Sequence, residues 1–380
     1  MANPYLNTVY WAAATVLFII ITSLISGASA RFVVKIRGGT KKLQERAFAG
    51  YLFAAPWVVG FLIFVLIPMV LSLYWSFNKV EPLKPVIWVG LKNYLDLFGD
   101  SDFKYAFLNS LFITVIGLPL QIGAALILAL LLSQKLRGMR LFRVAFYMPV
   151  VLGLNSAVLL CWGLMFNANN GIVTQIIQGL GQIFVPFNWL DRLFIYINEL
   201  ISAAFLGFQS GRYKILQNVI SAGFPAADRV PLWLQSPLWT KTSLIILLIW
   251  SCGTMMIFYL AALNNVPQEI YEAAEVDGAN AWQRFWNVTW PLITPYTFYN
   301  LIVGMIAIIQ LFNEPYVLFY NTPTVAQSAQ SVVYYLYINT FRFNRMGYGS
   351  AISWFLLIVI MFITLIQFRL QNRWVQYDLR

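Results

Sequence analysis

Long apolar runs separated by short polar stretches make up most of the chain. Each run is close to the roughly 20 apolar residues that a helix needs to cross the hydrocarbon core of a membrane. A spanning segment must be helical, because lipid offers no partner for an unpaired backbone amide or carbonyl. The pattern therefore predicts an all-α polytopic membrane protein with the spans Thr8–Ala30, Tyr51–Phe77, Ala106–Ser133, Arg143–Phe166, Thr242–Leu263, Tyr296–Phe312 and Gly349–Phe368.

The basic residues between the spans predict the orientation, since cytoplasmic loops carry an excess of Lys and Arg. Two loops are strongly basic, the first of them with Glu45 as its single acid and the second with no acid. Their basic residues are Arg31, Lys35, Arg37, Lys41, Lys42 and Arg46 in the first loop, and Lys135, Arg137, Arg140 and Arg143 in the second. Both loops are expected in the cytoplasm, which makes the N-terminus exterior and the C-terminal tail cytoplasmic.

Two segments outside the regular alternation leave alternatives open. Ala28-Ser29-Ala30 resembles a signal-peptide cleavage site, but a signal peptide has a basic start and a shorter apolar run, so a retained anchor is favoured. The exterior stretch 167–241 is too long for a simple connection. Its semi-apolar part, Asp191–Ser221, is interpreted as a small helical cap or a helix lying on the membrane, with an extra pair of spans as the alternative.

Composition excludes several classes of chemistry. The chain has no histidine, and its two cysteines, Cys161 and Cys252, lie in apolar runs, so no catalytic centre, metal site, haem or disulfide framework is expected. No Asp, Glu, Lys or Arg falls well inside a span, which argues against a proton-coupled carrier. No phosphate-binding loop motif is present, so any ATPase that drives this protein is another chain. The basic residues that give the net charge of +11 lie beside the spans, so membrane orientation explains them better than nucleic-acid binding does.

The polar loop 264–295, expected in the cytoplasm, has the pattern of a helical elbow. Pro267 suits the first turn of a helix, and Glu269, Glu272 and Glu275 lie where the positive end of the helix dipole favours acids. Gly278 then ends the helix, since it adopts a left-handed conformation without strain. A second short helix, Ala281–Val288, is predicted to follow. The acidic charge favours a basic partner surface, and an amphipathic helix that only caps the bundle is the alternative.

This loop resembles the EAA motif of ATP-binding-cassette (ABC) importer permeases. The matching residues are Glu272-Ala273-Ala274, Gly278 and, after nine residues, Val288-x-Trp290-Pro291. Val288 and Trp290 depart from the Ile-x-Leu-Pro of the family. The flanks resemble the carbohydrate-type, maltose and oligosaccharide subgroup: Val266-Pro267-Gln268-Glu269-Ile270-Tyr271, Asp277-Gly278-Ala279, Trp282-Gln283-Arg284-Phe285, Pro291-Leu292-Ile293-Thr294-Pro295 and Gly347-Tyr348-Gly349-Ser350-Ala351. The resemblance covers about Leu52 to Phe368.

The resemblance implies a six-helix importer permease core preceded by one extra N-terminal span. Segment 1–50 would be an N-terminal anchor and basic cytoplasmic linker, 51–368 the permease core with an exterior insertion at about 182–230, and 369–380 a cytoplasmic tail. The elbow would be a coupling helix seated in a cytoplasmic ATPase subunit, and closure of the ATPase dimer on ATP would rock the permease between two states. The residues implied at that contact are Glu272, Ala273, Ala274, Asp277 and Gly278.

The implied partners are a second permease subunit, two cytoplasmic ATPase subunits and an exterior solute-binding protein in the cell membrane. This chain would hold no cofactor, since ATP and Mg²⁺ would bind the ATPase. The function implied is a transporter subunit, not an enzyme, for a sugar or oligosaccharide. The alternatives are glycerol phosphate or another small polar solute with the same architecture, a sodium-coupled secondary carrier, and a membrane scaffold without transport.

A sugar path needs polar groups and aromatic faces inside the bundle. The family stretch Phe-Gln-x-Phe-Asp is similar to Ile309-Gln310-Leu311-Phe312-Asn313, and helical spacing would put Gln310, Asn313 and Glu314 on one face. The candidates are Gln310, Phe312, Asn313, Glu314, Ser251, Trp250 and Asn155, with Trp162 beside them. For each, the alternative is a helix–helix hydrogen bond or an interfacial aromatic. Asn321-Thr322-Pro323-Thr324 replaces the family's Gly-Gly-Pro after this span.

Overall fold

The computed structural model describes residues 4–134, 138–153, 156–167, 171–173, 175–176, 234, 240–319 and 327–376. Asn155, the insertion 182–230, the segment 191–221, the stretch 321–324 and the end of the tail lie outside these residues. The chain divides into two compact units, Met1–Gly90 and Leu91–Arg380. This boundary lies one span later than the predicted boundary after residue 50, so the first two predicted spans belong to one unit.

Within the described part of the chain, five helices are long and apolar enough to cross a membrane, and two bent helix pairs raise the number to seven. Each predicted span overlaps one of these helices or pairs. The fourth span, predicted as one helix over Arg143–Phe166, is wrong in that respect: it consists of two helices that meet at 113°. The first of them contains Pro149 and ends at Leu152, with Gly153 as its C-cap at a φ of 66°. A proline in the last turn and a glycine after it both favour the end of a helix at this point. The fifth predicted span also bends, by 40° after Trp250.

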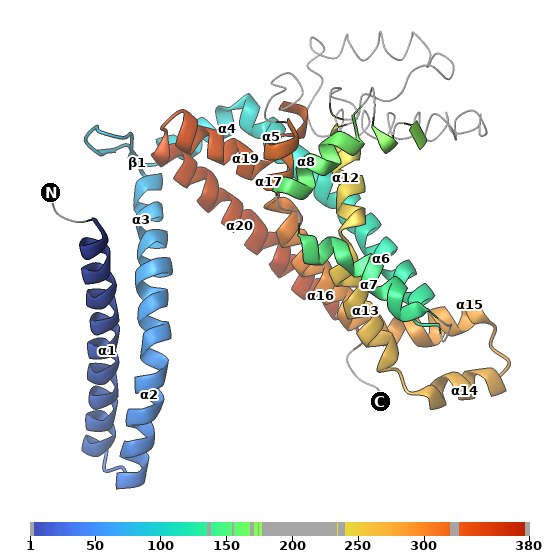
Figure 1. The fold of residues 1–380 in the computed structure, drawn as a ribbon, viewed down its shortest axis with the longest axis horizontal. Coiled ribbons are helices and arrows are strands. Elements are labelled where there is room, and N and C mark those ends of the chain that lie inside the picture. Colours follow the sequence, from blue (N-terminus) through green and yellow to red (C-terminus); the bar gives the residue numbers. More distant parts are fainter. Residues whose placement is uncertain are drawn as a thin grey trace. The chain divides into compact units, whose positions relative to one another are not determined.

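The first unit is a helical hairpin followed by a small two-stranded sheet. Helix α1 (Pro4–Ile36) runs beside a second, antiparallel run formed by α2 (Lys41–Phe61), η1 (Leu62–Leu66) and α3 (Ile67–Ser76) (Figure 1). Strands β1 (Asn78–Lys79) and β2 (Ile87–Trp88) pair antiparallel after it. The segment predicted as a linker is therefore helical on both sides of a four-residue turn, 37–40.

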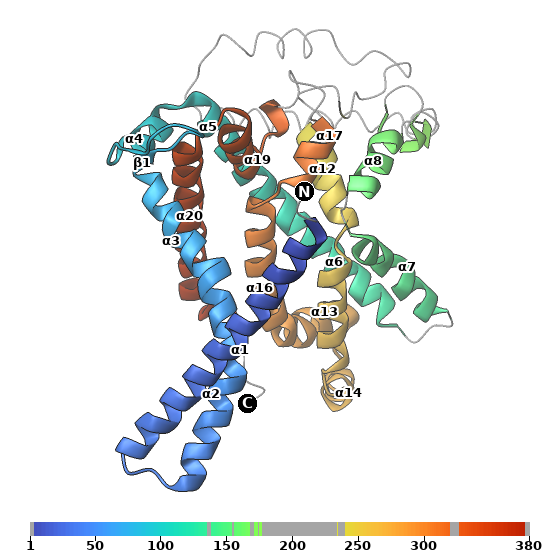
Figure 2. The same ribbon diagram turned by 60° about the vertical axis from the view of Figure 1, so that its left-hand side comes forward.

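The second unit holds the remaining helices. They are α4 (Lys92–Gly99), α5 (Ser101–Phe112), η2 (Ile113–Gly117), α6 (Leu118–Leu132), α7 (Met139–Leu152), α8 (Ser156–Met165), α12 (Thr240–Trp250), α13 (Gly253–Asn264), α14 (Gln268–Val276), α15 (Ala281–Arg284), η4 (Phe285–Thr289), α16 (Trp290–Ile309), α17 (Asn313–Phe319), α19 (Val332–Tyr337), η5 (Ile338–Arg342) and α20 (Met346–Gln371). Figures 1 and 2 place α4, α5, α17 and α19 at one end of this unit and α14 at the opposite end. Helices α6, α13 and α16 run between the two ends.

Two apolar clusters fill the second unit from end to end. One joins α5, α12, α16 and α20 through side chains such as Phe103, Leu244 and Ile352. The other lies nearer α14 and is built around Met256 and Tyr259 of α13, both fully buried. The Tyr259 hydroxyl donates a 3.0 Å hydrogen bond to Thr297 Oγ1, which satisfies a polar group that burial would otherwise penalise. The end that carries α14 is thus held to the rest of the unit by a packed core.

Three of the spanning helices contain a widened π-turn just before a proline. The turns η1, η2 and η4 each end two residues before Pro68, Pro119 and Pro291, respectively. Proline lacks the amide hydrogen and its ring clashes with the carbonyl four residues earlier, so a regular α-turn cannot form there. Widening the turn by one residue relieves this clash and keeps the helix continuous.

A single carboxylate ties three elements together at the end opposite α14. Asp100 caps the N-terminus of α5, its Oδ1 accepting hydrogen bonds from the backbone amides of Asp102 (3.0 Å) and Phe103 (3.4 Å). Its other oxygen accepts hydrogen bonds from the hydroxyls of Tyr335 in α19 and Tyr348 in α20, the latter at 2.7 Å. Partial burial opposes ionisation, but the four donors outweigh it and hold the pKa of Asp100 below its usual value. Asp100 therefore acts as a structural junction.

Candidate functional site

The predicted elbow is present and consists of α14, a short turn, α15 and η4 between the spans α13 and α16. Pro267 lies just before α14 as its N-cap and not in its first turn. The second predicted helix, Ala281–Val288, is found as α15 followed by the π-turn η4, which ends at Thr289. The whole elbow lies at the end of the second unit that Figures 1 and 2 mark with α14.

Gly278 ends α14 by a Schellman motif. Its φ is 77°, in the left-handed region that side chains disfavour. The Ala279 amide donates to the Ala274 carbonyl at 2.9 Å, and the Gly278 amide donates to the Glu275 carbonyl at 3.0 Å, which is the bonding pattern of that motif. A Cβ at Gly278 would meet nothing within 4 Å. The backbone conformation alone therefore favours glycine here.

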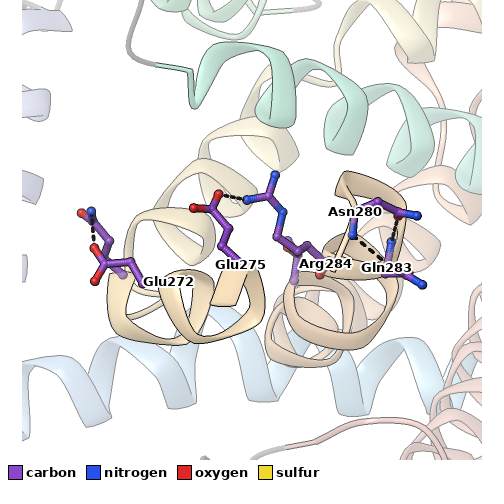
Figure 3. A network of polar contacts seen from close by, with 7 residues as sticks. Glu272, Glu275, Asn280, Gln283 and Arg284 are labelled. Atoms are coloured by element: carbon purple, nitrogen blue, oxygen red, sulfur yellow. Dashed lines mark hydrogen bonds and ion pairs between the residues drawn. The ribbon is translucent and has the colours of Figure 1, made fainter. Parts of the chain in front are cut away.

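Side-chain contacts bridge the turn between α14 and α15 and cap the start of α15 (Figure 3). Glu275 of α14 forms an ion pair with Arg284 of α15. Asn280 and Gln283 form a capping box at the start of α15, with two hydrogen bonds of 2.9 Å. These contacts make the elbow a defined unit, because each bond joins residues on opposite sides of the turn or at its exit.

A further contact fixes α14 to the base of α16. The Tyr271 hydroxyl lies 3.1 Å from Thr289 Oγ1 in η4, and Thr289 is buried. This hydrogen bond therefore joins α14 to η4, just before α16, in addition to the covalent chain.

The residues that the EAA resemblance assigns to an ATPase contact lie on the open side of α14. Glu272, Ala273 and Asp277 are exposed, while Ala274 is half-buried. Glu272 Oε1 accepts a 2.9 Å hydrogen bond from Gln268, and within the described residues it forms no ion pair (Figure 3). Val276 is 87% exposed, which leaves an apolar side chain uncovered beside the acids. This surface offers both charge and an apolar contact to a partner.

Trp290, which stands where the family motif has leucine, packs between η4 and the apolar core. Its ring lies 5.8 Å from that of Trp286 and 6.3 Å from that of Phe285, measured between centroids. It also packs against the apolar cluster around Met256 and Tyr259. The larger side chain thus fills a half-buried position between η4 and the core.

The path candidates at the far end of α16 do not share one helical face. The prediction of a continuous helix through Gln310, Asn313 and Glu314 is wrong, because α16 ends at Ile309 and α17 begins at Asn313. Gln310 and Asn313 are exposed, whereas Glu314 is buried at 8% exposure. Burial raises the pKa of the Glu314 carboxyl. The structure therefore separates an exposed amide pair from a buried acid.

An aromatic ladder, which the sequence did not reveal, surrounds Phe312. We use this name for Phe312 and Tyr316 with Tyr334, Tyr337 and Phe341. Phe312 stacks on Tyr316 at 5.2 Å between ring centroids, and both rings contact Tyr337 at 5.2 and 5.4 Å. Tyr337 then contacts Phe341, which is 62% exposed, at 5.3 Å. The ladder runs from the buried Tyr334, past the half-buried Phe312 and Tyr316, to the open ring of Phe341. Exposed rings of this kind can stack on the apolar faces of a sugar.

The remaining candidates lie along the bent span. Trp250 packs edge-on against Trp162 at 5.2 Å and belongs to a small apolar cluster. Ser251 lies at the bend, where its hydroxyl donates to the Leu248 carbonyl and Gln121 Nε2 approaches it at 3.4 Å. Gln121 is buried in α6 and was missed, although a lone amide in an apolar span was a visible signal. Asn155 lies outside the described residues.

Comparison with known proteins places the chain in a family. The model for the inner membrane component of binding-protein-dependent transport systems matches residues 105–377, all within the second compact unit. The chain belongs to this family. This confirms the resemblance to ABC importer permeases and a multi-pass location in the inner membrane. The hairpin α1–α2 lies outside the matched residues.

Similar proteins match over most of their length. The chain is 29% identical to the probable ABC transporter permease protein YesP of Bacillus subtilis, over 89% of this chain and 95% of the relative. It is 31% identical to the arabinooligosaccharides transport system permease protein AraP of the same organism, over 89% and 93%. It is 30% identical to the lactose transport system permease protein LacF of Rhizobium radiobacter, over 84% and 92%.

Solved structures confirm the fold. A chain from the crystal structure of a bacterial alginate ABC transporter, in complex with an alginate pentasaccharide-bound periplasmic protein, superposes with a TM-score of 0.65. The superposition covers 87% of this chain and 96% of the other at 21% sequence identity. The all-α membrane fold predicted from the sequence is therefore confirmed.

Proposed function

We propose that this chain is the permease subunit of an ATP-driven importer for an oligosaccharide, forming half of the translocation path. Several relatives are named for arabinooligosaccharide or lactose transport, which supports a carbohydrate. The aromatic ladder from Phe312 to Phe341 supports the same class, because ring faces and nearby amides suit a sugar. Its partners are a second permease, two ATPase subunits that hold ATP and Mg²⁺, and an exterior solute-binding protein.

The observation that carries this proposal is the rigid elbow with its open acidic surface. An ATPase that closes on ATP delivers force, and the permease must receive it on an element that does not deform. The Schellman motif at Gly278, the Glu275–Arg284 pair and the Tyr271–Thr289 hydrogen bond provide that element. The elbow joins two spans, so displacing it displaces α13 and α16 together.

The orientation follows from the same assignment. With α14 against cytoplasmic ATPases, the N-terminus is exterior and the C-terminal tail is cytoplasmic. The aromatic ladder, at the opposite end of the second unit, then faces the exterior, where a solute-binding protein delivers substrate. No part of the catalysis resides in this chain, because ATP hydrolysis belongs to the partner.

Charge reversal at Glu272 tests the proposal. In the complete transporter, Glu272→Lys should weaken co-purification of the ATPase with the permease and lower ATP-driven uptake of a labelled oligosaccharide into vesicles. Glu272→Gln should have a smaller effect, since it removes the charge without reversing it. Asp96→Lys is the matched control, because Asp96 is an exposed acid in α4, at the other end of the unit. Unchanged assembly and uptake in Glu272→Lys would reject the coupling role of α14.

A further inference from the structure

The turn between α1 and α2 concentrates the positive charge that predicts its cytoplasmic side, and the proposed transport function assigns this charge no binding partner. We call residues Arg31–Arg46 the hairpin tip. It contains six basic residues and one acid, Glu45, and all seven are exposed. Within the described part of the chain none of them forms an ion pair; the basic residues are Arg31, Lys35, Arg37, Lys41, Lys42 and Arg46. The tip therefore presents a nearly uncompensated cationic surface.

The backbone of the hairpin tip is fixed. Gly38 has a φ of 72°, its amide donates to the Lys35 carbonyl at 3.1 Å, and the Gly39 amide donates to the Val34 carbonyl at 2.9 Å. These bonds form a second Schellman motif, the same device that ends α14. Gln44 Nε2 donates to the Gly39 carbonyl at 2.9 Å and fastens α2 to the turn. The cations on the two helices are thus held at set positions and not on a loose linker.

The number of helical residues beyond the apolar run determines how far the basic side chains lie from the hydrocarbon core of the membrane. The apolar part of α1 ends at Ala30, and Arg31–Ile36 adds six residues, or about 9 Å at the helical rise. Lys41–Arg46 adds the same length at the start of α2. The headgroup layer on one side of a bilayer is roughly 5 to 8 Å thick. The basic side chains consequently lie at the depth of lipid phosphates, and little of the tip extends beyond them.

Apolar side chains lie between the cations. Phe32, Ile36 and Leu43 are 63%, 69% and 52% exposed. A surface that mixes exposed apolar and basic side chains suits the boundary between acyl chains and anionic headgroups. A soluble acidic protein would leave these apolar groups in water or require a matching pocket. In addition, Lys41 and Lys42 lie at the positive end of the α2 dipole, so their charge does not stabilise the helix.

We propose that the hairpin tip binds anionic phospholipid headgroups at the membrane surface. The proposal rests on the membrane location of the chain and not on the role of the elbow. Lys41 and Lys42 pair with lipid phosphates on one side of the turn, and Arg31, Lys35 and Arg37 on the other. Phe32 and Leu43 enter the upper acyl region between them. The tip thereby fixes the depth and the tilt of the N-terminal hairpin.

Spin-labelled lipids test this proposal with the full chain in vesicles of equal parts phosphatidylcholine and phosphatidylglycerol. The fraction of each labelled lipid that the protein immobilises gives its preference for the anionic headgroup. The double variant Lys41→Gln/Lys42→Gln should reduce that preference by roughly fivefold for each lysine that contacts a phosphate. Raising the salt to about 1 M, where the screening length falls to about 3 Å, should remove the wild-type preference.

The chain supplies a matched control in the same unit. Lys79 and Lys84 are also exposed, but both pair with Glu81, so Lys79→Gln/Lys84→Gln should leave the preference unchanged. Lys41→Arg/Lys42→Arg keeps the charge and should retain the preference, which separates charge from folding. Equal selectivity in the wild type and the Lys41/Lys42 glutamine variant would overturn the proposal. Loss of ATPase co-purification by that variant in neutral detergent would also overturn it, in favour of a protein partner.

Discussion

A substitution at Gly278 tests whether uptake depends on the backbone conformation of the elbow, because it changes that conformation without adding a steric clash. A Cβ at this position would meet nothing within 4 Å, so a substitution adds no clash. Its cost comes from the backbone, since φ is 77° and an L-residue in the left-handed region costs roughly 1 to 2 kcal/mol. A cost of that size shifts the local equilibrium away from the Schellman motif by about 5- to 30-fold. It is small against a typical total stability of about 5 to 15 kcal/mol, so the chain stays folded.

The measurement is ATP-driven uptake by the complete transporter in vesicles, together with its rate of ATP hydrolysis. We expect Gly278→Val to lower uptake severalfold while membrane insertion is unaffected. Gly278→Asn should transport close to the wild-type rate, because asparagine tolerates the left-handed conformation better than other side chains. The two variants thus differ in backbone preference at one position.

Gly38 provides a control that separates the conformational cost of the substitution from a role of the elbow in transport. It has a φ of 72°, an equally open surrounding and the same hydrogen-bonding motif, but it lies in the hairpin tip. Gly38→Val carries the same conformational cost and should leave uptake unchanged. If Gly278→Val transports as fast as the wild type, or if Gly38→Val loses as much uptake, the reasoning about the elbow fails.

Three further variants test other parts of the structure. Asp100→Asn should lower the free energy of unfolding by about 1 to 2 kcal/mol relative to Asp96→Asn in denaturation assays, because it weakens four hydrogen bonds to a partly exposed carboxylate. That difference should shrink below about pH 4, since the folded-state pKa of Asp100 lies under its usual 3.8 and the contribution is lost as pH falls through it. Tyr316→Leu should raise the substrate concentration for half-maximal uptake, whereas Tyr299→Leu, outside the aromatic ladder, should not. Tyr271→Phe should lower the amount transported per ATP hydrolysed while the transporter still assembles; an unchanged ratio would contradict a role for its hydroxyl.

The sequence predicted the features that depend on neighbouring residues. The spans follow from continuous apolar runs, and the elbow follows from Pro267, the acids of α14 and Gly278, all within one short stretch. Gly278 was identified correctly because its role is a local backbone conformation. In these places the chain needs no distant partner to determine its structure.

Features that depend on distant residues were not predicted. The aromatic ladder joins α17 to α19 and η5, so no spacing along one helix indicates it. The break after Ile309 put Glu314 in the interior and Gln310 on the surface, although their spacing suggested a shared face. The role of Asp100 could not be read from its neighbours, because its tyrosine partners lie more than 200 positions later in the chain.

The π-turn η4 has a consequence for how the elbow is aimed. Successive residues of an α-helix are rotated by about 100° around its axis. Because η4 absorbs one extra residue before Pro291, the same residues in regular α-turns would place everything on the N-terminal side of η4 at a rotation of about that angle relative to α16. Glu272 and Val276 would then point along a different side of the bundle with their identities unchanged. The width of the turn before Pro291, as much as the residues of α14 themselves, determines the direction in which α14 presents its surface.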